Sequence, residues 1–276
     1  MDLLELDKQI RLFLAEDIGQ GDITTDPIFT DEREADARFV ACEPLVAVGM
    51  LNVAARVFQI LNQNIVIEFA AADGLKVATD EVLLKLRGPV RDLLRGERVA
   101  LNLVQRLCGI AALTSKYVDQ VAGLNVRITD TRKTTPGLRM LEKYAVRIGG
   151  GHNHRFNLSD GVLIKDNHIS ACGSIKEAVR KVRETVPHTV RIEVETDNMA
   201  QVQECLECDV DIIMLDNMSL DETRKAVRLI HGKALVEASG GVNLDTVRQI
   251  AETGVDLISV GRLTHSAPAS DISMEM

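Results

Sequence analysis

Six short aliphatic segments recur from residue 126 onward, and each is followed by a segment with the periodicity of a helix. Strands that alternate with helices form parallel sheets, because the chain must cross over one face of the sheet before the next strand begins. The pattern therefore predicts an α/β fold. The predicted strands are residues 126–129, 161–164, 190–194, 210–215, 234–238 and 255–260.

A polar or small residue ends each of these predicted strands. In a parallel β/α barrel the carboxyl ends of the strands meet at one face, and that face carries the chemistry. Because the strands number six rather than eight, we expect an incomplete, open β/α barrel. The six residues are Asp130, Lys165, Glu195, Asp216, Ser239 and Gly261.

The last two predicted strands run into glycine-rich turns, Ser239-Gly240-Gly241 and Gly261-Arg262. Backbone N–H groups of such loops, together with the N-terminus of a following helix, bind phosphate in many barrels of this type. These turns therefore predict a phosphate site at the end of the barrel.

The first hundred residues have a mixed pattern, typical of an α+β domain. Helical periodicity over 3–15 and 52–62 alternates with strand-like segments, and a longer helical pattern covers 91–121. Gly109 is a candidate break that would divide the last pattern into two helices. We expect an N-terminal α+β domain over residues 1–108 that forms a dimer and contributes to the partner's active site. The barrel would cover residues 109–268, and a tail over residues 269–276 would pack back on the N-terminal domain.

Composition excludes several classes of function. The net charge of -9 and an aromatic content of 3% without tryptophan argue against binding of nucleic acid. No apolar run approaches the length of a membrane span, so we expect no membrane association. Five scattered cysteines, an odd number, indicate reduced thiols, and we expect a cytoplasmic protein.

The segment from Arg132 to His168 reverses the sign of the charge. It holds seven arginines and lysines against three acids, in a chain that is otherwise strongly acidic. Three of the six histidines, His152, His154 and His168, also lie there. A concentrated basic segment in an acidic protein is typical of a site for a small, multiply charged anion.

Four segments together resemble the quinolinate phosphoribosyltransferase family, in the expected order and over nearly the whole chain. They are DTRKTTPGLRMLEKYAV from Asp130, RIGGGHNHRFNLSDGVLIKDNH from Arg147, VEASGGV from Val236 and VGRLTHS from Val260. The resemblance implies transfer of the phosphoribosyl group of phosphoribosyl pyrophosphate to quinolinate. Pyrophosphate and carbon dioxide are released, and nicotinate mononucleotide is formed for de novo NAD synthesis. It also implies a homodimer or a larger homo-oligomer with active sites at the subunit interface.

The resemblance further implies roles for individual residues. Catalysis would involve Lys133, Lys165, Glu195 and Asp216. Glu195 and Asp216 would also hold Mg²⁺, directly or through water. Quinolinate would be bound by Arg98 of the neighbouring subunit and by Arg132, Lys133, Thr134, His154, Arg155 and Lys165. Phosphoribosyl pyrophosphate would be bound by Lys133, Lys165, Glu195, Asp216, Ser239, Gly240, Gly241 and Gly261.

Several alternatives remain open at the level of sequence. Lys165 ends a barrel strand, where the Schiff-base lysine of an aldolase would also lie. His152 and His154 could suggest a metal site, although an i, i+2 pair is a poor chelate on a helix and the glycine-rich loop favours an anion contact. Arg98 could belong to a solvated basic helix face. A related phosphoribosyltransferase with another base, or a non-catalytic sugar-phosphate sensor, would share much of the pattern.

Overall fold

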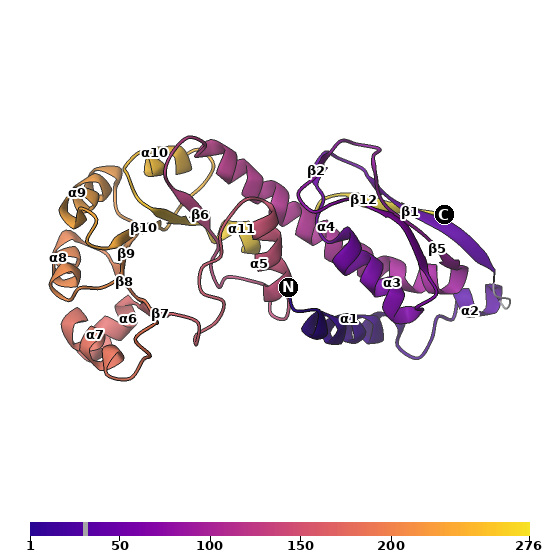
Figure 1. Ribbon diagram of the computed structural model, residues 1–276, viewed down its shortest axis with the longest axis horizontal. Helices are drawn as coiled ribbons and strands as arrows, with labels where there is room; N and C mark the ends of the chain where they lie inside the picture. Colours follow the sequence, from indigo (N-terminus) through magenta and orange to yellow (C-terminus); the bar gives the residue numbers. More distant parts are fainter. Residues whose placement is uncertain (30–32) are drawn as a thin grey trace. The chain divides into compact units, whose positions relative to one another are not determined.

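The computed structural model describes residues 1–29 and 33–276 and divides into two compact units (Figure 1). The first unit comprises Met1–Thr114, Thr135–Gly150 and Ser266–Met276, and the second comprises Ser115–Thr134 and Gly151–His265. Residues 109–114, 135–150 and 266–268, which the sequence predicts to be part of the barrel, thus belong to the first unit.

The second unit contains, within the described residues, a six-stranded parallel sheet. Its order is β6-β11-β10-β9-β8-β7, so that β6 and β7 are the two edges and the barrel stays open between them. The predicted incomplete β/α barrel is confirmed. Its strands are β6 (Arg127–Thr129), β7 (Val162–Ile164), β8 (Ile192–Thr196), β9 (Ile212–Asp216), β10 (Leu235–Ser239) and β11 (Leu257–Ser259).

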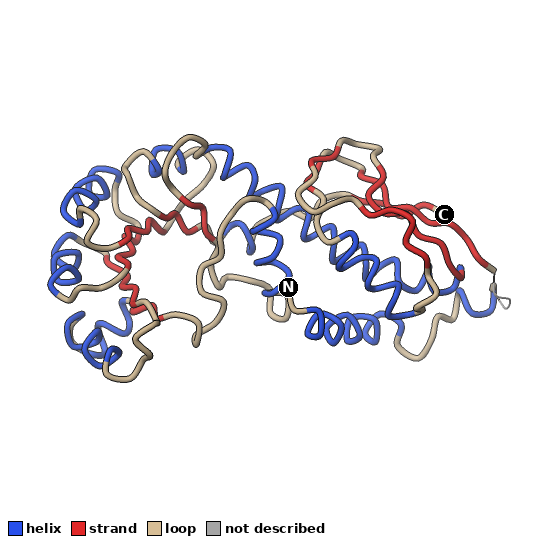
Figure 2. The backbone as a smooth tube through the Cα atoms, in the orientation of Figure 1, coloured by secondary structure: helices blue, strands red, loops and turns tan. Residues whose placement is uncertain are grey.

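Helices line the outer side of this curved sheet (Figure 2). Their first turns follow the usual capping rules. Ser219 and Glu222 form a reciprocal capping box at the start of α9, and Ser174 accepts a hydrogen bond from the Glu177 N–H at the start of α7. The helices are α6 (Asp166–Cys172), α7 (Ile175–Arg183), α8 (Met199–Glu207), α9 (Leu220–Ile230), α10 (Val247–Ala251) and α11 (Arg262–His265).

The first unit is built on an antiparallel sheet in the order β12-β1-β5-β3. The C-terminal strand β12 pairs with β1, with Phe39 opposite Met274. Its core includes an edge-to-face contact of Phe39 with Phe58, whose ring centroids are 6.0 Å apart. Its strands are β1 (Glu34–Ala41), β2 (Leu45–Val46), β3 (Val66–Ala70), β4 (Lys76–Val77), β5 (Val82–Pro89) and β12 (Ile272–Glu275). Its helices are α1 (Leu3–Ile18), α2 (Thr25–Ile28), the π-helix η1 (Met50–Ala54), α3 (Ala55–Leu61) and α5 (Arg139–Ile148).

A single helix, α4 (Val90–Gln120), covers residues 91–120 of the helical pattern predicted over 91–121. The proposed division at Gly109 is wrong. A Cβ at this position would lie 1.9 Å from the carbonyl oxygen of Pro268, so that glycine allows the C-terminal segment to approach the helix backbone. Although α4 is 31 residues long, no helix in the described ranges combines the length and the apolar character that a membrane crossing requires.

Candidate active site

A cavity of about 710 Å³ lies in the second unit, where the loops that follow the barrel strands converge. Because parallel strands all end at one face, these loops come together although they are far apart in the sequence. Most of the predicted site residues line this cavity. They are Arg132, Lys133, His154, Arg155, Lys165, Glu195, Asp216, Ser239, Gly240, Gly241 and Gly261.

The cavity is predominantly cationic. Among the described residues that line it, five carry a positive charge and two a negative one, Glu195 and Asp216. Burial, and then the neighbouring Arg132, lower the pKa of the Arg155 guanidinium below its ordinary value. Like charges held this close are favourable only when an anion lies between them, so the cavity suits a ligand with several acidic groups. The five cations are Arg132, Lys133, Arg155, Lys165 and Arg262.

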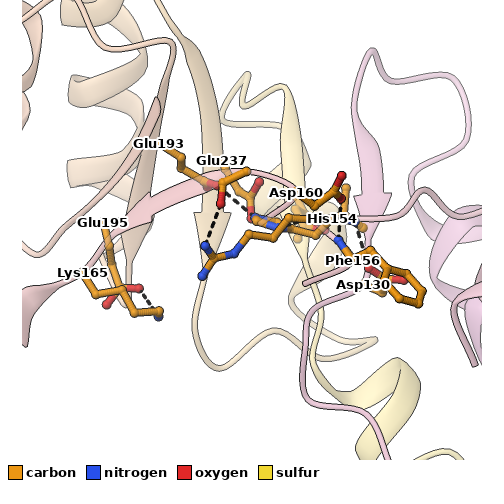
Figure 3. Close-up of polar contacts among 12 residues, drawn as sticks. Asp130, His154, Phe156, Asp160, Lys165, Glu193, Glu195 and Glu237 are labelled. Carbon is orange, nitrogen blue, oxygen red and sulfur yellow. Dashed lines mark hydrogen bonds and ion pairs between the residues drawn. The ribbon is translucent and has the colours of Figure 1, made fainter. Parts of the chain in front are cut away.

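Lys165 and Glu195 form an ion pair at the mouth of the barrel, with the Lys165 Nζ 2.7 Å from the Glu195 Oε2 (Figure 3). Lys165 follows β7 directly and Glu195 belongs to the neighbouring β8, so that the sheet itself sets their separation. A Schiff-base lysine is activated in an apolar pocket or beside another cation. Lys165 instead lies against a carboxylate, which disfavours the aldolase alternative.

Asn217 is a cavity residue that the sequence analysis did not single out. It follows β9 with a φ of 53°, and its side-chain amide donates a hydrogen bond of 2.8 Å to the Asp216 Oδ2. Asparagine is among the few non-glycine residues that readily adopt this left-handed conformation. The dipeptide Asp216-Asn217 at a strand end was the available signal for it.

The glycine turns provide space as well as backbone donors. At Gly240 (φ 91°), an added Cβ would lie 2.2 Å from the Asn217 Oδ1, so only glycine admits the asparagine side chain there. A Cβ on Gly261 would lie 3.0 Å from the Lys133 Cδ. The Thr264 hydroxyl also donates to the Lys133 carbonyl oxygen at 2.8 Å, which ties the segment that carries Lys133 to the second glycine turn.

His154 has partners other than the expected ligand. Its Nδ1 accepts a hydrogen bond of 2.8 Å from the Arg155 N–H, and its Nε2 lies 3.0 Å from the Glu193 Oε2. Glu193 and Glu237 are buried acids that the sequence analysis missed. They lie on β8 and β10 and point toward His154 (Figure 3). The period of two in Glu193-Val194-Glu195, which directs both acids to one side of the strand, could have identified Glu193.

Two predicted residues do not line the cavity. The Thr134 N–H and hydroxyl instead bond the Arg132 carbonyl oxygen at 2.9 and 3.4 Å, so that this residue shapes the turn of the basic segment. Arg98 lies on α4 in the first unit, and its side chain is 58% exposed. Other cavity residues were not assigned a role from the sequence. Asn243 directly follows the VEASGGV segment, and Arg262 and His265 lie within the VGRLTHS segment, at the two ends of α11.

The two acids of the cavity fit a hard divalent cation. Glu195 and Asp216 lie near the carboxyl ends of adjacent strands, where Glu195 pairs with Met214 and Thr196 with Leu215. Carboxylate oxygens, water and the oxygens of a phosphorylated ligand are the ligands that Mg²⁺ prefers. The donor set is therefore chemically suitable for this ion, directly or through water.

Comparisons with known proteins agree with this geometry. A model described as the C-terminal domain of quinolinate phosphoribosyl transferase matches residues 110–275, and one described as the N-terminal domain matches residues 22–108. The probable nicotinate-nucleotide pyrophosphorylase (carboxylating) of Bacillus subtilis is 46% identical over 276 residues, covering 100% of this chain and 95% of that protein. The corresponding Mycobacterium leprae protein is 40% identical, covering 97% and 95%.

Solved structures show the same likeness in three dimensions. The nicotinate-nucleotide pyrophosphorylase of Francisella tularensis superposes with a TM-score of 0.93 at 37% identity, covering 100% of this chain and 97% of that one. That of Ehrlichia chaffeensis superposes with a TM-score of 0.92 at 44% identity, covering 97% of each chain.

Proposed function

The chain belongs to the quinolinate phosphoribosyltransferase family, and from this premise we propose that it transfers the phosphoribosyl group of phosphoribosyl pyrophosphate to quinolinate. The products are nicotinate mononucleotide, pyrophosphate and carbon dioxide, and the reaction belongs to de novo NAD biosynthesis. The observation that carries this proposal is one cavity in which five cations, two acids and two glycine turns meet at the strand ends.

Substrate binding follows from the distribution of charge. Quinolinate carries two carboxylates. The planar guanidinium groups of Arg132 and Arg155 and the compact ammonium group of Lys165 are suited to binding them. Lys133 belongs to the basic segment, and its side chain lies against Gly261 of the second glycine turn, a position suited to both substrates. The 5′-phosphate of the sugar donor would occupy the glycine turns formed by Ser239, Gly240, Gly241 and Gly261.

The reaction needs no covalent intermediate with the protein. The ring nitrogen of quinolinate bonds to the anomeric carbon as the bond from that carbon to pyrophosphate breaks, and the electron pair leaves with pyrophosphate. Glu195 and Asp216 stabilise the positive charge that develops on the ribose, and Lys133 and Lys165 stabilise the departing anion. Mg²⁺ held by the two acids would add neutralisation of the pyrophosphate charge.

Decarboxylation then follows from the charge on the ring. Once alkylated, the ring nitrogen is positively charged and stabilises the electron pair that remains on the adjacent carbon when carbon dioxide leaves. A proton taken up at that carbon completes nicotinate mononucleotide. The protein needs to hold the remaining carboxylate and the ring in place, which the cations of the cavity can do.

Turnover with defined substrates tests this function. The protein is incubated with quinolinate, phosphoribosyl pyrophosphate and Mg²⁺, and nicotinate mononucleotide is measured by liquid chromatography and mass spectrometry. We expect stoichiometric nicotinate mononucleotide, pyrophosphate and carbon dioxide, and no product when EDTA removes the metal. Binding of both substrates without turnover would instead indicate a sensor, and turnover only with another base would indicate a related transferase.

We further propose that the protein is a cytoplasmic homo-oligomer, at least a dimer, in which Arg98 completes the quinolinate site of a neighbouring subunit. Support comes from the position of Arg98, which is exposed on α4 of the first unit while the other cations line a cavity within the second. Arginine is well suited to binding a carboxylate across an interface, because its guanidinium is always charged and weakly hydrated.

A further inference from the structure

Three ionisable side chains form a cluster inside the second unit that the proposed reaction does not use directly. His154, Glu193 and Glu237 place their ligating atoms within 4.8 Å of one another, and the two glutamates are 4% and 1% exposed (Figure 3). Within the described part of the chain, the Glu193 Oε1 and the Glu237 Oε1 have no hydrogen-bond partner. Buried carboxylates with unsatisfied oxygens destabilise a fold, which makes this cluster a candidate for a functional role.

The cluster has the composition of a metal site, but its hydrogen bonds argue against one. A histidine that binds a metal through one nitrogen normally donates a hydrogen bond from the other. In His154 the Nδ1 accepts the Arg155 N–H, so in the neutral ring the proton must lie on the Nε2. That proton points to the Glu193 Oε2 at 3.0 Å, with the Glu237 Oε1 at 3.7 Å.

The same hydrogen bonds connect the buried acids to the cationic cavity. His154 is bonded through its Nδ1 to the backbone of Arg155, whose side chain lines the cavity and donates to the Gly161 carbonyl oxygen at 2.8 Å. On the other side, the buried Asp130 accepts the His154 N–H at 2.8 Å and the Asn153 side-chain amide at 2.7 Å.

This segment lies at the open edge of the barrel, where strand pairing alone does not fix it. His152 forms a single bridge with Thr129 of β6, and its N–H donates to the Ile128 carbonyl oxygen at 2.8 Å. Beyond His152 the chain leaves the sheet. The side chain of Asp130, which follows β6, therefore holds Asn153 and the His154 backbone, and Glu193 of β8 and Glu237 of β10 contact the His154 ring.

We propose that Glu193 and Glu237 are positioning residues that act through His154. They hold the imidazole in its Nε2-protonated form, and the Nδ1 then fixes the backbone of Arg155 so that its guanidinium faces the carboxylates of the acidic substrate. The inference rests on the proposed function for the identity of that substrate, quinolinate. It makes His154 a link between the barrel interior and Arg155.

Kinetics of the full-length protein test the role of Glu193. Glu193→Gln keeps the shape of the side chain but removes the carboxylate. We expect the KM for quinolinate to rise on the order of tenfold or more, while the KM for phosphoribosyl pyrophosphate stays within about twofold. The matched control is Asp211→Asn, which alters an acid that accepts the Ile192 N–H at the opposite end of β8, and we expect it to leave both KM values unchanged.

A double-mutant cycle separates positioning from general destabilisation. If Glu193 acts through Arg155, Glu193→Gln adds little to the quinolinate KM of an Arg155→Ala protein. If the two substitutions act independently, the factors by which they raise the quinolinate KM multiply in the double variant, and this result would overturn the inference. An unchanged quinolinate KM in Glu193→Gln alone would overturn it as well. Failure of the wild-type protein to use quinolinate would instead overturn the proposed function.

The protonation of His154 can be tested without any substrate. In protein labelled with ¹⁵N-histidine, long-range ¹H–¹⁵N spectra distinguish the two neutral forms of the ring, and His154→Asn identifies the signal. We expect the Nε2-protonated form, unaltered by one equivalent of Zn²⁺. An Nδ1-protonated ring, or stoichiometric Zn²⁺ binding that Glu193→Gln abolishes, would contradict the positioning role and support a metal site.

Discussion

Gly240 and Asn217 lie in contact beside the carboxyl ends of β10 and β9, and each depends on the other. The asparagine adopts a left-handed backbone conformation, and its amide donates to Asp216. The glycine leaves the space that this side chain occupies. The orientation of a proposed metal and ribose ligand thus depends on a glycine in the neighbouring loop.

We predict that Gly240→Ala lowers kcat/KM about a hundredfold while the protein remains folded. The new methyl group would displace Asn217, and with it the hydrogen bond that orients Asp216. Gly232→Ala, in the turn after α9 and outside the cavity, is the control, because Gly232 also has positive φ but no atom within 4 Å of the added Cβ. It should cost about 1–2 kcal/mol of stability and little activity. Equal activity losses in the two variants would contradict the prediction.

Glu237 gives the stability of the protein a predictable pH dependence. Burial, followed by the neighbouring Glu193, raises the pKa of Glu237 from 4.5 to about 7, whereas His154 opposes this shift and Asp130 adds to it. Between these two values the folded state retains a proton that the unfolded state has lost. The free energy of unfolding should therefore decrease as the pH rises through this range.

Glu237→Gln should make the free energy of unfolding less dependent on pH in this range, because glutamine does not titrate. Urea unfolding measured at about pH 5 and about pH 8 would show a smaller difference for the variant than for the wild type. Glu207→Gln, at an exposed position on α8, should retain the wild-type difference. Unfolding curves that shift equally with pH in Glu237→Gln and the wild type would contradict the assignment.

At the scale of elements, the strand β8 carries two acids of the second unit, and the helix α4 supports the C-terminal segment. β8 directs Glu193 into the barrel and Glu195 to its mouth, because side chains two residues apart lie on the same side of a strand. In α4, Gly109 leaves room for the segment around Pro268 that leads to β12. The helix therefore serves as the support for the C-terminal residues.

Gly109→Ala should lower the free energy of unfolding by about 2 kcal/mol, although alanine is the better helix former. The Cβ would overlap the Pro268 carbonyl oxygen, and relief of that overlap requires movement of the C-terminal segment. Ser115→Ala, further along α4, should change the free energy of unfolding by less than about 0.5 kcal/mol. Chemical denaturation measures the free energy of unfolding of both variants. A Gly109→Ala protein more stable than the wild type would contradict the prediction that the Pro268 carbonyl oxygen restricts residue 109 to glycine.

At the scale of the whole molecule, the charges proposed to bind quinolinate are divided between the two units. Arg132, Arg155 and Lys165 line the cavity of the second unit, whereas Arg98 belongs to the first. An interface that joins the first unit of one subunit to the second unit of another would bring Arg98 to the cavity cations of the neighbouring subunit.

Subunit mixing tests this division. Arg98→Ala and Lys165→Ala proteins should each be nearly inactive, because each lacks a cation for the dicarboxylate. A mixed dimer should recover about half of the wild-type activity per site, because one of its two sites contains neither substitution. A random 1:1 mixture, in which about half of the dimers are mixed, should therefore recover up to about a quarter. Mixed dimers confirmed by mass spectrometry but without any recovery would contradict a role for Arg98 across the interface.

Much of the barrel was predictable because its signals are local. The aliphatic segments, the turns between them and the residue at each strand end are read directly along the chain, and the six predicted strands overlap β6 to β11. The cationic cavity followed from the same reasoning, since parallel strands bring their ends together wherever they lie in the sequence. Glu193 and Glu237 were missed because they lie within their strands rather than at the strand ends. A buried acid in that position looks like a surface residue of an alternating pattern unless its spacing from a strand-end acid, as between Glu193 and Glu195, is taken into account.

Residue types and their periodicity along the chain were sufficient to predict the β/α architecture, the basic segment and the acids and glycines that end the strands. Three features became apparent only in the folded chain: α4 continues past Gly109, residues 135–150 join the first unit, and His154 turns toward Glu193 and Glu237. These features depend on contacts between residues many positions apart, whose distances and hydrogen bonds are set only when the chain folds.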